Sequence, residues 1–165
     1  MKSKVTKDIV PDDFTLSLAI VDAIPVVTFC ISMLIIGKII ESKLFALGAL
    51  LCFCAGAAKV IWKIIVVINK KNIWFFFVQM RIIMPIGLLI IIISLFINSG
   101  NIAYLINGVT SMPSLLFFVF GLICMGLMLI FGFVLDGSKS KNNWIEQCTN
   151  IVAQLCFLIG LMIVK

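Results

Sequence analysis

Five long apolar runs, separated by short polar segments, dominate the pattern of the chain. They cover residues 14–37, 44–68, 73–97, 114–135 and 144–164. A helix of about 20 residues crosses the roughly 30 Å hydrocarbon core of a bilayer, and each run reaches that length. A transmembrane β-strand would alternate polar and apolar positions, whereas these runs are continuous. The pattern predicts an all-α integral membrane bundle of about five transmembrane helices.

The segments between the runs indicate a single domain. Residues 1–13 form a polar tail, and residues 136–143 form a polar connector before the last run. The connector 98–113 has no charge but contains an apolar patch at 102–106, for which we expect a helical turn in the membrane interface. We therefore expect one membrane domain over residues 14–165, preceded by a cytoplasmic tail at residues 1–13.

Composition excludes several classes of protein. The chain is 63% hydrophobic and 12% charged, too little charge to cover a water-soluble domain. It has no histidine, and none of its six cysteines forms a CxxC pair. It also lacks HExxH, GxSxG and Walker motifs. We expect no catalytic residues, no metal and no cofactor, and the sequence favours a protein that is not an enzyme.

The distribution of lysine predicts the orientation, because cytoplasmic connectors are enriched in Lys and Arg. One side of the predicted topology holds the tail and the second and fourth connectors, with Lys2, Lys4, Lys7, Lys70, Lys71, Lys139 and Lys141. The other side holds only Lys38, Lys43 and Lys165. We expect a cytoplasmic N-terminus and an outside C-terminus, in the plasma (inner) membrane.

Four charged residues lie at distinctly intramembrane positions of the predicted spans, namely Asp22, Lys59, Lys63 and Arg81. Each costs about 2.5–3.5 kcal/mol at the bilayer centre, so a partner or a function is expected. Asp22 can pair with Lys59 or Arg81, which lie at a similar depth, and thereby orient the helices. Lys63 is shallower and can extend its amine to the interface. Three cations against one anion leave an excess of positive charge, which favours an anionic ligand.

Polar residues add to the same half of the bundle. Glu146, Asn150 and Gln154 share one helix face, which can form interhelical hydrogen bonds or line a site. We expect a polar pocket that opens toward the cytoplasm. Its ligand-binding candidates are Asp22, Lys59, Lys63, Arg81, Gln79, Asn150 and Gln154. The small residues Gly48, Cys52 and Gly56 predict close helix packing on the second span.

Three functions are compatible with this sequence. The first is a transporter, or a transporter subunit, whose pocket binds a small anionic solute. The second is a non-catalytic accessory, regulatory or immunity-type membrane protein whose buried charges serve helix assembly or partner docking. The third is a lipid-headgroup enzyme with Lys59, Lys63 and Arg81 as phosphate binders. The expected partner is the lipid bilayer, with a homo-oligomer or another membrane protein as open alternatives and no nucleic acid.

Overall fold

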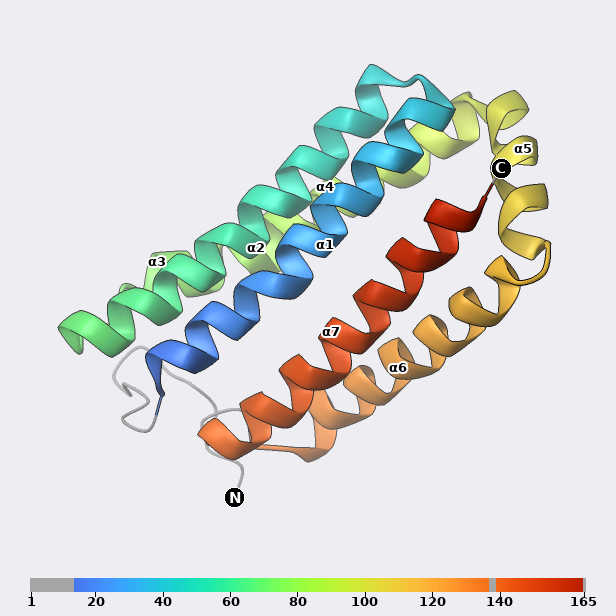
Figure 1. Ribbon diagram of the computed structural model, residues 1–165. Coiled ribbons are helices and arrows are strands. Elements are labelled where there is room, and N and C mark those ends of the chain that lie inside the picture. The colour runs from blue at the N-terminus through green and yellow to red at the C-terminus, as the bar shows by residue number, and fades with distance from the viewer. Residues whose placement is uncertain (1–13, 137–138, 165) are drawn as a thin grey trace.

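The computed structural model describes residues 14–136 and 139–164, and the regular structure in these ranges is helical (Figure 1). The helices are α1 (Leu16–Ile40), α2 (Lys43–Asn69), α3 (Trp74–Val78), α4 (Met80–Ile97), α5 (Ser99–Thr110), α6 (Ser114–Val134) and α7 (Ser140–Ile163). Within the described part, α1, α2, α3 with α4, α6 and α7 form five segments long and apolar enough to cross a membrane. The predicted all-α membrane bundle is confirmed. The predicted tail, residues 1–13, lies outside the described residues.

Hydrogen-bonded caps, rather than hydropathy, set several helix ends. Thr15 Oγ1 accepts a hydrogen bond from the backbone N–H of Leu18, and Ser42 Oγ accepts one from Phe45, each at 3.3 Å. Such caps satisfy amide groups that the first turn of a helix leaves free. Only Glu41 and Ser42 therefore separate α1 from α2, where the sequence predicted a longer connector.

Helix α7 begins at Ser140, four residues before its predicted start. The prediction treated the polar residues before Trp144 as a loop because it followed the apolar run alone. Apolarity marks the part of a helix that lies in hydrocarbon, however, and the backbone continues its hydrogen bonding beyond that part. The extra turn brings Asn143 into the bundle, where its side chain is buried.

The third span consists of α3 and α4 in succession, with Gln79 between them. The backbone stays helical at this residue: the Gln79 N–H donates to the Phe75 carbonyl oxygen at 3.0 Å, and the Gln79 carbonyl oxygen accepts from the Ile83 N–H at 2.8 Å. The buried Gln79 side chain donates through Nε2 to the carbonyl oxygens of Phe76 at 3.2 Å and of Ala55 on α2 at 3.1 Å. Gln79 therefore connects the third span to α2.

The five spans pack as a row, in the order α4, α2, α1, α7, α6. Within the described residues, α4 and α6, at the two ends of this row, are not closely packed against each other. The start of α1 and the end of α7 lie at opposite ends of the bundle, and the short helix α5 lies near the end of α7 (Figure 1). Helix α5 extends well beyond the helical turn predicted around residues 102–106.

Small residues sit where neighbouring helices approach closely. A Cβ added to Gly48 would lie 2.8 Å from the carbonyl oxygen of Gly87 on α4, and one added to Gly87 would lie 2.7 Å from Cys52 Sγ. The same addition to Gly56 would lie 3.1 Å from Val26 of α1. Gly48 and Cys52 thus face α4, while Gly56 faces α1.

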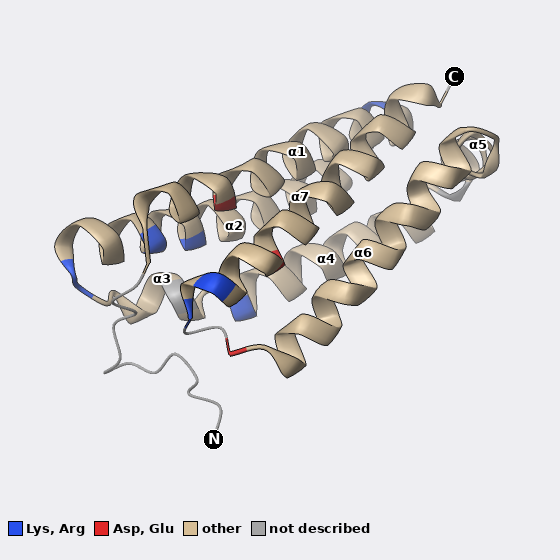
Figure 2. Ribbon diagram, turned by 60° about the horizontal axis from the view of Figure 1, so that its bottom comes forward, with Lys and Arg blue, Asp and Glu red and all other residues tan. Residues whose placement is uncertain are grey.

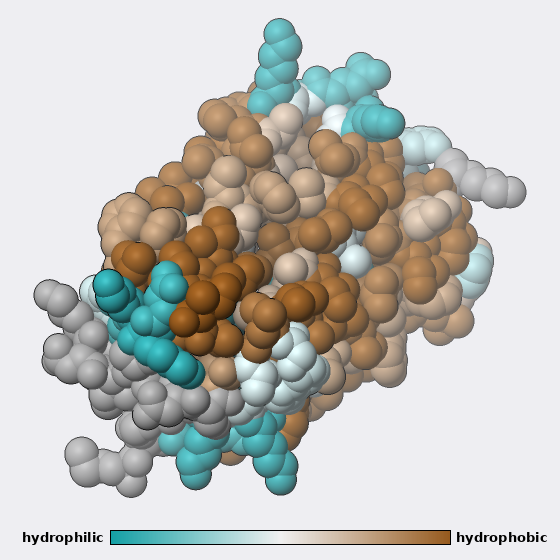
Figure 3. All heavy atoms as spheres, turned by 60° about the vertical axis from the view of Figure 1, so that its left-hand side comes forward, coloured by the Kyte–Doolittle hydropathy of each residue, from teal (hydrophilic) through white to brown (hydrophobic). Residues whose placement is uncertain are grey.

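Large apolar side chains cover much of the outer surface. Figure 3 shows a broad hydrophobic band between hydrophilic groups at the two ends of the visible face. Many exposed side chains of the spans are leucine, isoleucine or phenylalanine, including Leu34, Ile68, Phe96, Leu129 and Phe133. A soluble monomer rarely exposes so much contiguous apolar surface, whereas a lipid-facing surface requires it.

Candidate functional site

The intramembrane charges gather in one half of the bundle. Figure 2 shows charged positions on α1, α2, α4 and α7, toward the end of the bundle at which α1 begins. The two most deeply buried are Asp22 on α1 and Lys63 on α2, with exposed side-chain fractions of 5% and 2%. These two residues form the centre of the polar region.

Asp22 and Lys63 form a buried ion pair. Lys63 Nζ lies 3.0 Å from Asp22 Oδ2 and donates to Asn143 Oδ1 at 3.4 Å. The same nitrogen lies 5.7 Å from the centre of the Phe14 ring, a distance at which the ring face attracts a cation. One carboxylate, one amide and one aromatic ring therefore surround the ammonium group.

This pairing corrects two sequence-based interpretations. The partner of Asp22 is Lys63, not Lys59 or Arg81, although Lys63 lies nearer the end of the span. Lys63 does not extend to the interface, because Phe14 and Trp62 belong to an apolar cluster beside it and both are buried. A flexible lysine side chain can span about one helical turn, so similar depth along the helix axes did not identify the pair.

Beside this pair lies a cavity of about 250 Å³ at the meeting point of five helices. Its walls come from α1, α2, α4, α6 and α7. The polar residues that line it are Asp22, Lys59, Glu146, Gln147, Asn150 and Gln154. The cavity therefore brings together four of the seven predicted ligand-binding candidates: Asp22, Lys59, Asn150 and Gln154.

Most polar side chains in this cavity have no protein partner. Among the described residues, the side chains of Lys59, Glu146, Asn150 and Gln154 form no hydrogen bond or ion pair. Gln147 is only 4% exposed, and its Oε1 atom accepts no hydrogen bond. The interhelical hydrogen bonds considered for the face of Glu146, Asn150 and Gln154 are thus not formed within the described chain. Lys59, Glu146, Asn150 and Gln154 are partly exposed, whereas Gln147 is buried. Buried polar atoms are normally satisfied, so the Oε1 atom of Gln147 indicates a place for a ligand or water.

Three of the predicted ligand-binding candidates do not line the cavity. Lys63 lies behind Asp22 in the ion pair, and Gln79 donates its amide to backbone carbonyls. Arg81 is exposed on α4 and is not among the lining residues. The expected excess of positive charge depended on Arg81. Without it, the cavity has one cation, Lys59, against Glu146 and the already paired Asp22.

The remaining wall of the cavity is apolar and rich in methionine. It consists of Pro25, Val26, Phe29, Cys52, Gly56, Met80, Met84, Met125 and Met128. Methionine is flexible and polarisable, so it adapts to ligands of different shape. The cavity thus combines a polar side, mainly from α7 and α2, with an adaptable apolar side.

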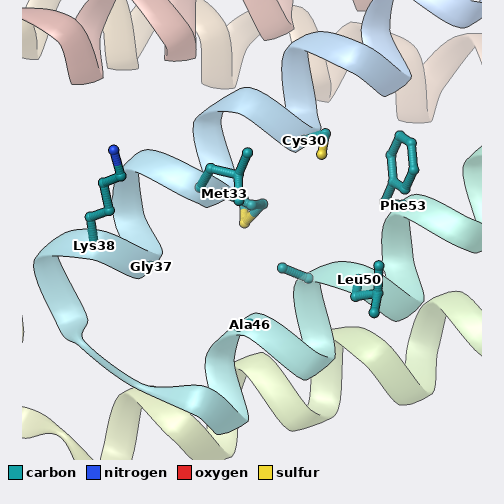
Figure 4. Close-up of a pocket in the computed structure, with 9 residues that line it drawn as sticks. Cys30, Met33, Gly37, Lys38, Ala46, Leu50 and Phe53 are labelled. Atoms are coloured by element: carbon teal, nitrogen blue, oxygen red, sulfur yellow. The ribbon is translucent and has the colours of Figure 1, made fainter.

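A second hollow, of about 400 Å³, lies between α1 and α2 nearer their connection (Figure 4). Its lining is almost entirely apolar and includes Cys30, Met33, Leu50 and Phe53, with Lys38 near its rim. It is the larger of the two, but it offers no set of convergent polar groups. The smaller cavity is therefore the better candidate for a specific site.

Gln147 and Asn143 are site residues that the sequence-based candidates omitted. Together with Asn150 and Gln154 they follow a spacing of four, three and four residues, which places side chains on one helix face. That pattern was visible in the sequence. It was missed because the predicted last span began at Trp144, which left Asn143 in a connector.

No family model, curated protein or solved structure matches this chain. The fold and the cavity define an all-α membrane bundle with a polar site among its spans. Any function must therefore be argued from that site.

Proposed function

We propose that this protein is a membrane transporter, or a subunit of one, that binds a small solute through an anionic group. The observation that supports it is the cavity among five spans, in which Lys59 forms no ion pair with a described residue. An ionisable residue inside a membrane span commonly marks a substrate or ion pathway. Lys59 is the group for the solute's anion, because Lys63 is already paired with Asp22.

The size of the cavity limits the solute. Pockets for drug-sized ligands measure about 300–1,000 Å³, and this cavity is smaller, at about 250 Å³. Five spans form a small transporter, and the most apolar stretch of α6 has only 11% of its residues buried. We therefore propose that a second copy of this chain or another membrane protein packs against α6.

The proposed orientation places the cavity nearer the cytoplasm. Four lysines lie at the end of the bundle where α1 begins. Lys70 and Lys71 directly follow α2, Lys139 directly precedes α7, and Lys141 lies in the first turn of α7. Under the positive-inside rule this end is cytoplasmic, and the membrane is the plasma (inner) membrane. The solute then enters or leaves the cavity on the cytoplasmic side.

An accessory role is the second candidate, and the Asp22–Lys63 pair favours it, since a buried pair can serve helix assembly alone. That role, however, does not explain why the polar side chains of the cavity have no hydrogen-bond partner among the described residues.

A lipid-headgroup enzyme finds less support. Its three supposed phosphate binders are separated: Lys63 is paired, and Arg81 does not line the cavity that Lys59 lines.

Uptake by proteoliposomes tests the proposal. Purified protein is reconstituted and offered radiolabelled lactate, 4-methylpentanoate and leucine, which all carry a carboxylate. We expect at least one to accumulate, and Lys59→Met to reduce its initial rate about tenfold or more, since a charge-assisted hydrogen bond is lost. Arg81→Gln is the matched control, a cation changed on another span outside the cavity lining.

Two results would contradict this function. One is uptake of all three solutes no faster than by protein-free liposomes. The other is an equal loss of rate in Lys59→Met and Arg81→Gln proteins that both elute as folded species. A protein that instead co-purifies with one membrane partner in stoichiometric amount, without uptake, would favour the accessory role.

A further inference from the structure

The charges that remain free in the cavity differ from those that an anion alone would need. Asp22 is neutralised by Lys63 at 3.0 Å, so its carboxylate already has a counter-charge. Two charged groups of the lining are left, Lys59 on α2 and Glu146 on α7. They form no ion pair with each other or with another described residue. A cation and an anion therefore face the same space, and neither is in an ion pair with a described residue.

A second acceptor stands beside Glu146. The Oε1 atom of Gln147 is buried and accepts no hydrogen bond, although its side chain lines the cavity. A buried acceptor left unpaired is unfavourable, so a donor from a ligand would be favoured there. An ammonium group offers three N–H donors and no acceptor. It can therefore satisfy a carboxylate and an amide oxygen at once, which a carboxylate ligand cannot do.

We propose that the solute is a zwitterion, with its carboxylate on Lys59, its ammonium on Glu146 and Gln147, and an apolar side chain against the methionines. The apolar side chain follows from Met80, Met84, Met125 and Met128, which line the cavity from α4 and α6. A neutral α-amino acid with an aliphatic or thioether side chain has this chemistry. This inference rests on the proposed function, since it specifies the solute of the same cavity.

Three matched probes separate the two charged groups. Leucine carries both groups, 4-methylpentanoate lacks the ammonium, and 3-methylbutylamine lacks the carboxylate, while all three share the same branched chain. Binding is measured by competition against radiolabelled leucine on the purified protein in lipid nanodiscs. We expect leucine to bind about tenfold or more tightly than either single-charge analogue, because each lost group removes a charge-assisted contact.

Two substitutions give the crossed control. Lys59→Met should weaken leucine and 4-methylpentanoate but not 3-methylbutylamine. Glu146→Gln should weaken leucine and 3-methylbutylamine but leave 4-methylpentanoate unchanged or stronger. The affinity series on the unaltered protein needs neither variant, so a variant that fails to fold does not remove the test.

The outcomes separate this inference from the transport proposal. If 4-methylpentanoate binds as tightly as leucine, or if none of the three probes binds, the zwitterion site is wrong. Lys59-dependent uptake of a simple carboxylate would still support transport. If leucine binds with the expected preference but proteoliposomes take up neither leucine nor the other two solutes, the zwitterion site stands and the transport proposal fails.

Discussion

At the residue scale, two lysines one helical turn apart on α2 have different surroundings. Lys63 is buried against Asp22, Asn143 and the ring of Phe14. Lys59 lines the cavity and forms no ion pair with a described residue. Identical side chains thus differ in setting: Lys63 is in a buried ion pair between two helices, and Lys59 lines the cavity. The two lysines provide a controlled comparison of stability against binding.

We expect Lys63→Met to lower the free energy of unfolding by about 3–5 kcal/mol, because it leaves the Asp22 carboxylate buried without its counter-charge. Lys59→Met should change stability much less, since it breaks no ion pair. The measurement is unfolding of the purified protein in mixed micelles, followed by circular dichroism.

The pair itself is tested by a double-mutant cycle. Asp22→Asn combined with Lys63→Met should be more stable than the sum of the single losses predicts, because the double variant buries no unpaired charge. Additive losses would show that Asp22 and Lys63 stabilise the bundle independently, contrary to the ion pair.

The sequence revealed the importance of these charges but not their arrangement. Hydropathy marks Asp22, Lys59 and Lys63 as intramembrane from residue order alone. Which lysine meets Asp22 depends on the rotation of α2 about its axis and on the reach of a flexible side chain. The rotation of α2 is set by its packing against α1 and α4, which a pattern along one chain does not contain.

At the element scale, the contact of α2 with α4 depends on glycine, which has no side chain, at the points of closest approach. Gly48 and Gly87 bring the two backbones close, since a Cβ at Gly48 would lie 2.8 Å from the Gly87 carbonyl oxygen. Gly126 on α6 is the opposite case, because a Cβ there would have no neighbouring atom within 4 Å. The close approach of α2 and α4 therefore requires a glycine at position 48, whereas the surroundings of Gly126 leave room for a side chain.

Substitution of these glycines by alanine should have opposite effects. We expect Gly48→Ala to cost about 1–3 kcal/mol through overpacking against α4. Gly126→Ala should be neutral or stabilise by up to about 1 kcal/mol, because alanine favours the helix. Thermal unfolding in detergent measures both. A Gly48→Ala protein as stable as the unaltered chain would contradict the close approach of α2 and α4.

The elements also show which structural features hydropathy predicts well. It located all five spans, because each span is apolar around most of its circumference. It missed the first turn of α7, because that turn is polar and its Asn143 accepts a hydrogen bond from Lys63 of α2. A polar pocket was predicted, and four of its expected residues line the cavity. The absence of Arg81 from the lining and the methionine-rich wall were not predicted, because both depend on how the helices pack.

At the scale of the whole molecule, orientation decides which compartment the cavity serves. We expect Lys70→Cys to be protected from a membrane-impermeant thiol reagent in intact cells and Asn107→Cys to be labelled. The experiment uses a chain whose six native cysteines are replaced, and both positions are exposed in the structure. Permeabilised cells, in which both should react, are the control. The reverse pattern would place the cavity nearer the outside.

The Asp22–Lys63 pair also has a consequence for biogenesis. It joins two spans that are separated along the chain by only Glu41 and Ser42. A span with a lone charge enters the bilayer at a cost of about 2.5–3.5 kcal/mol, and that cost falls when the opposite charge enters beside it. We therefore expect α1 and α2 to leave the insertion machinery together, as a helical hairpin. A chain without Lys63 should then insert less efficiently and reach the membrane in a smaller amount than the unaltered chain.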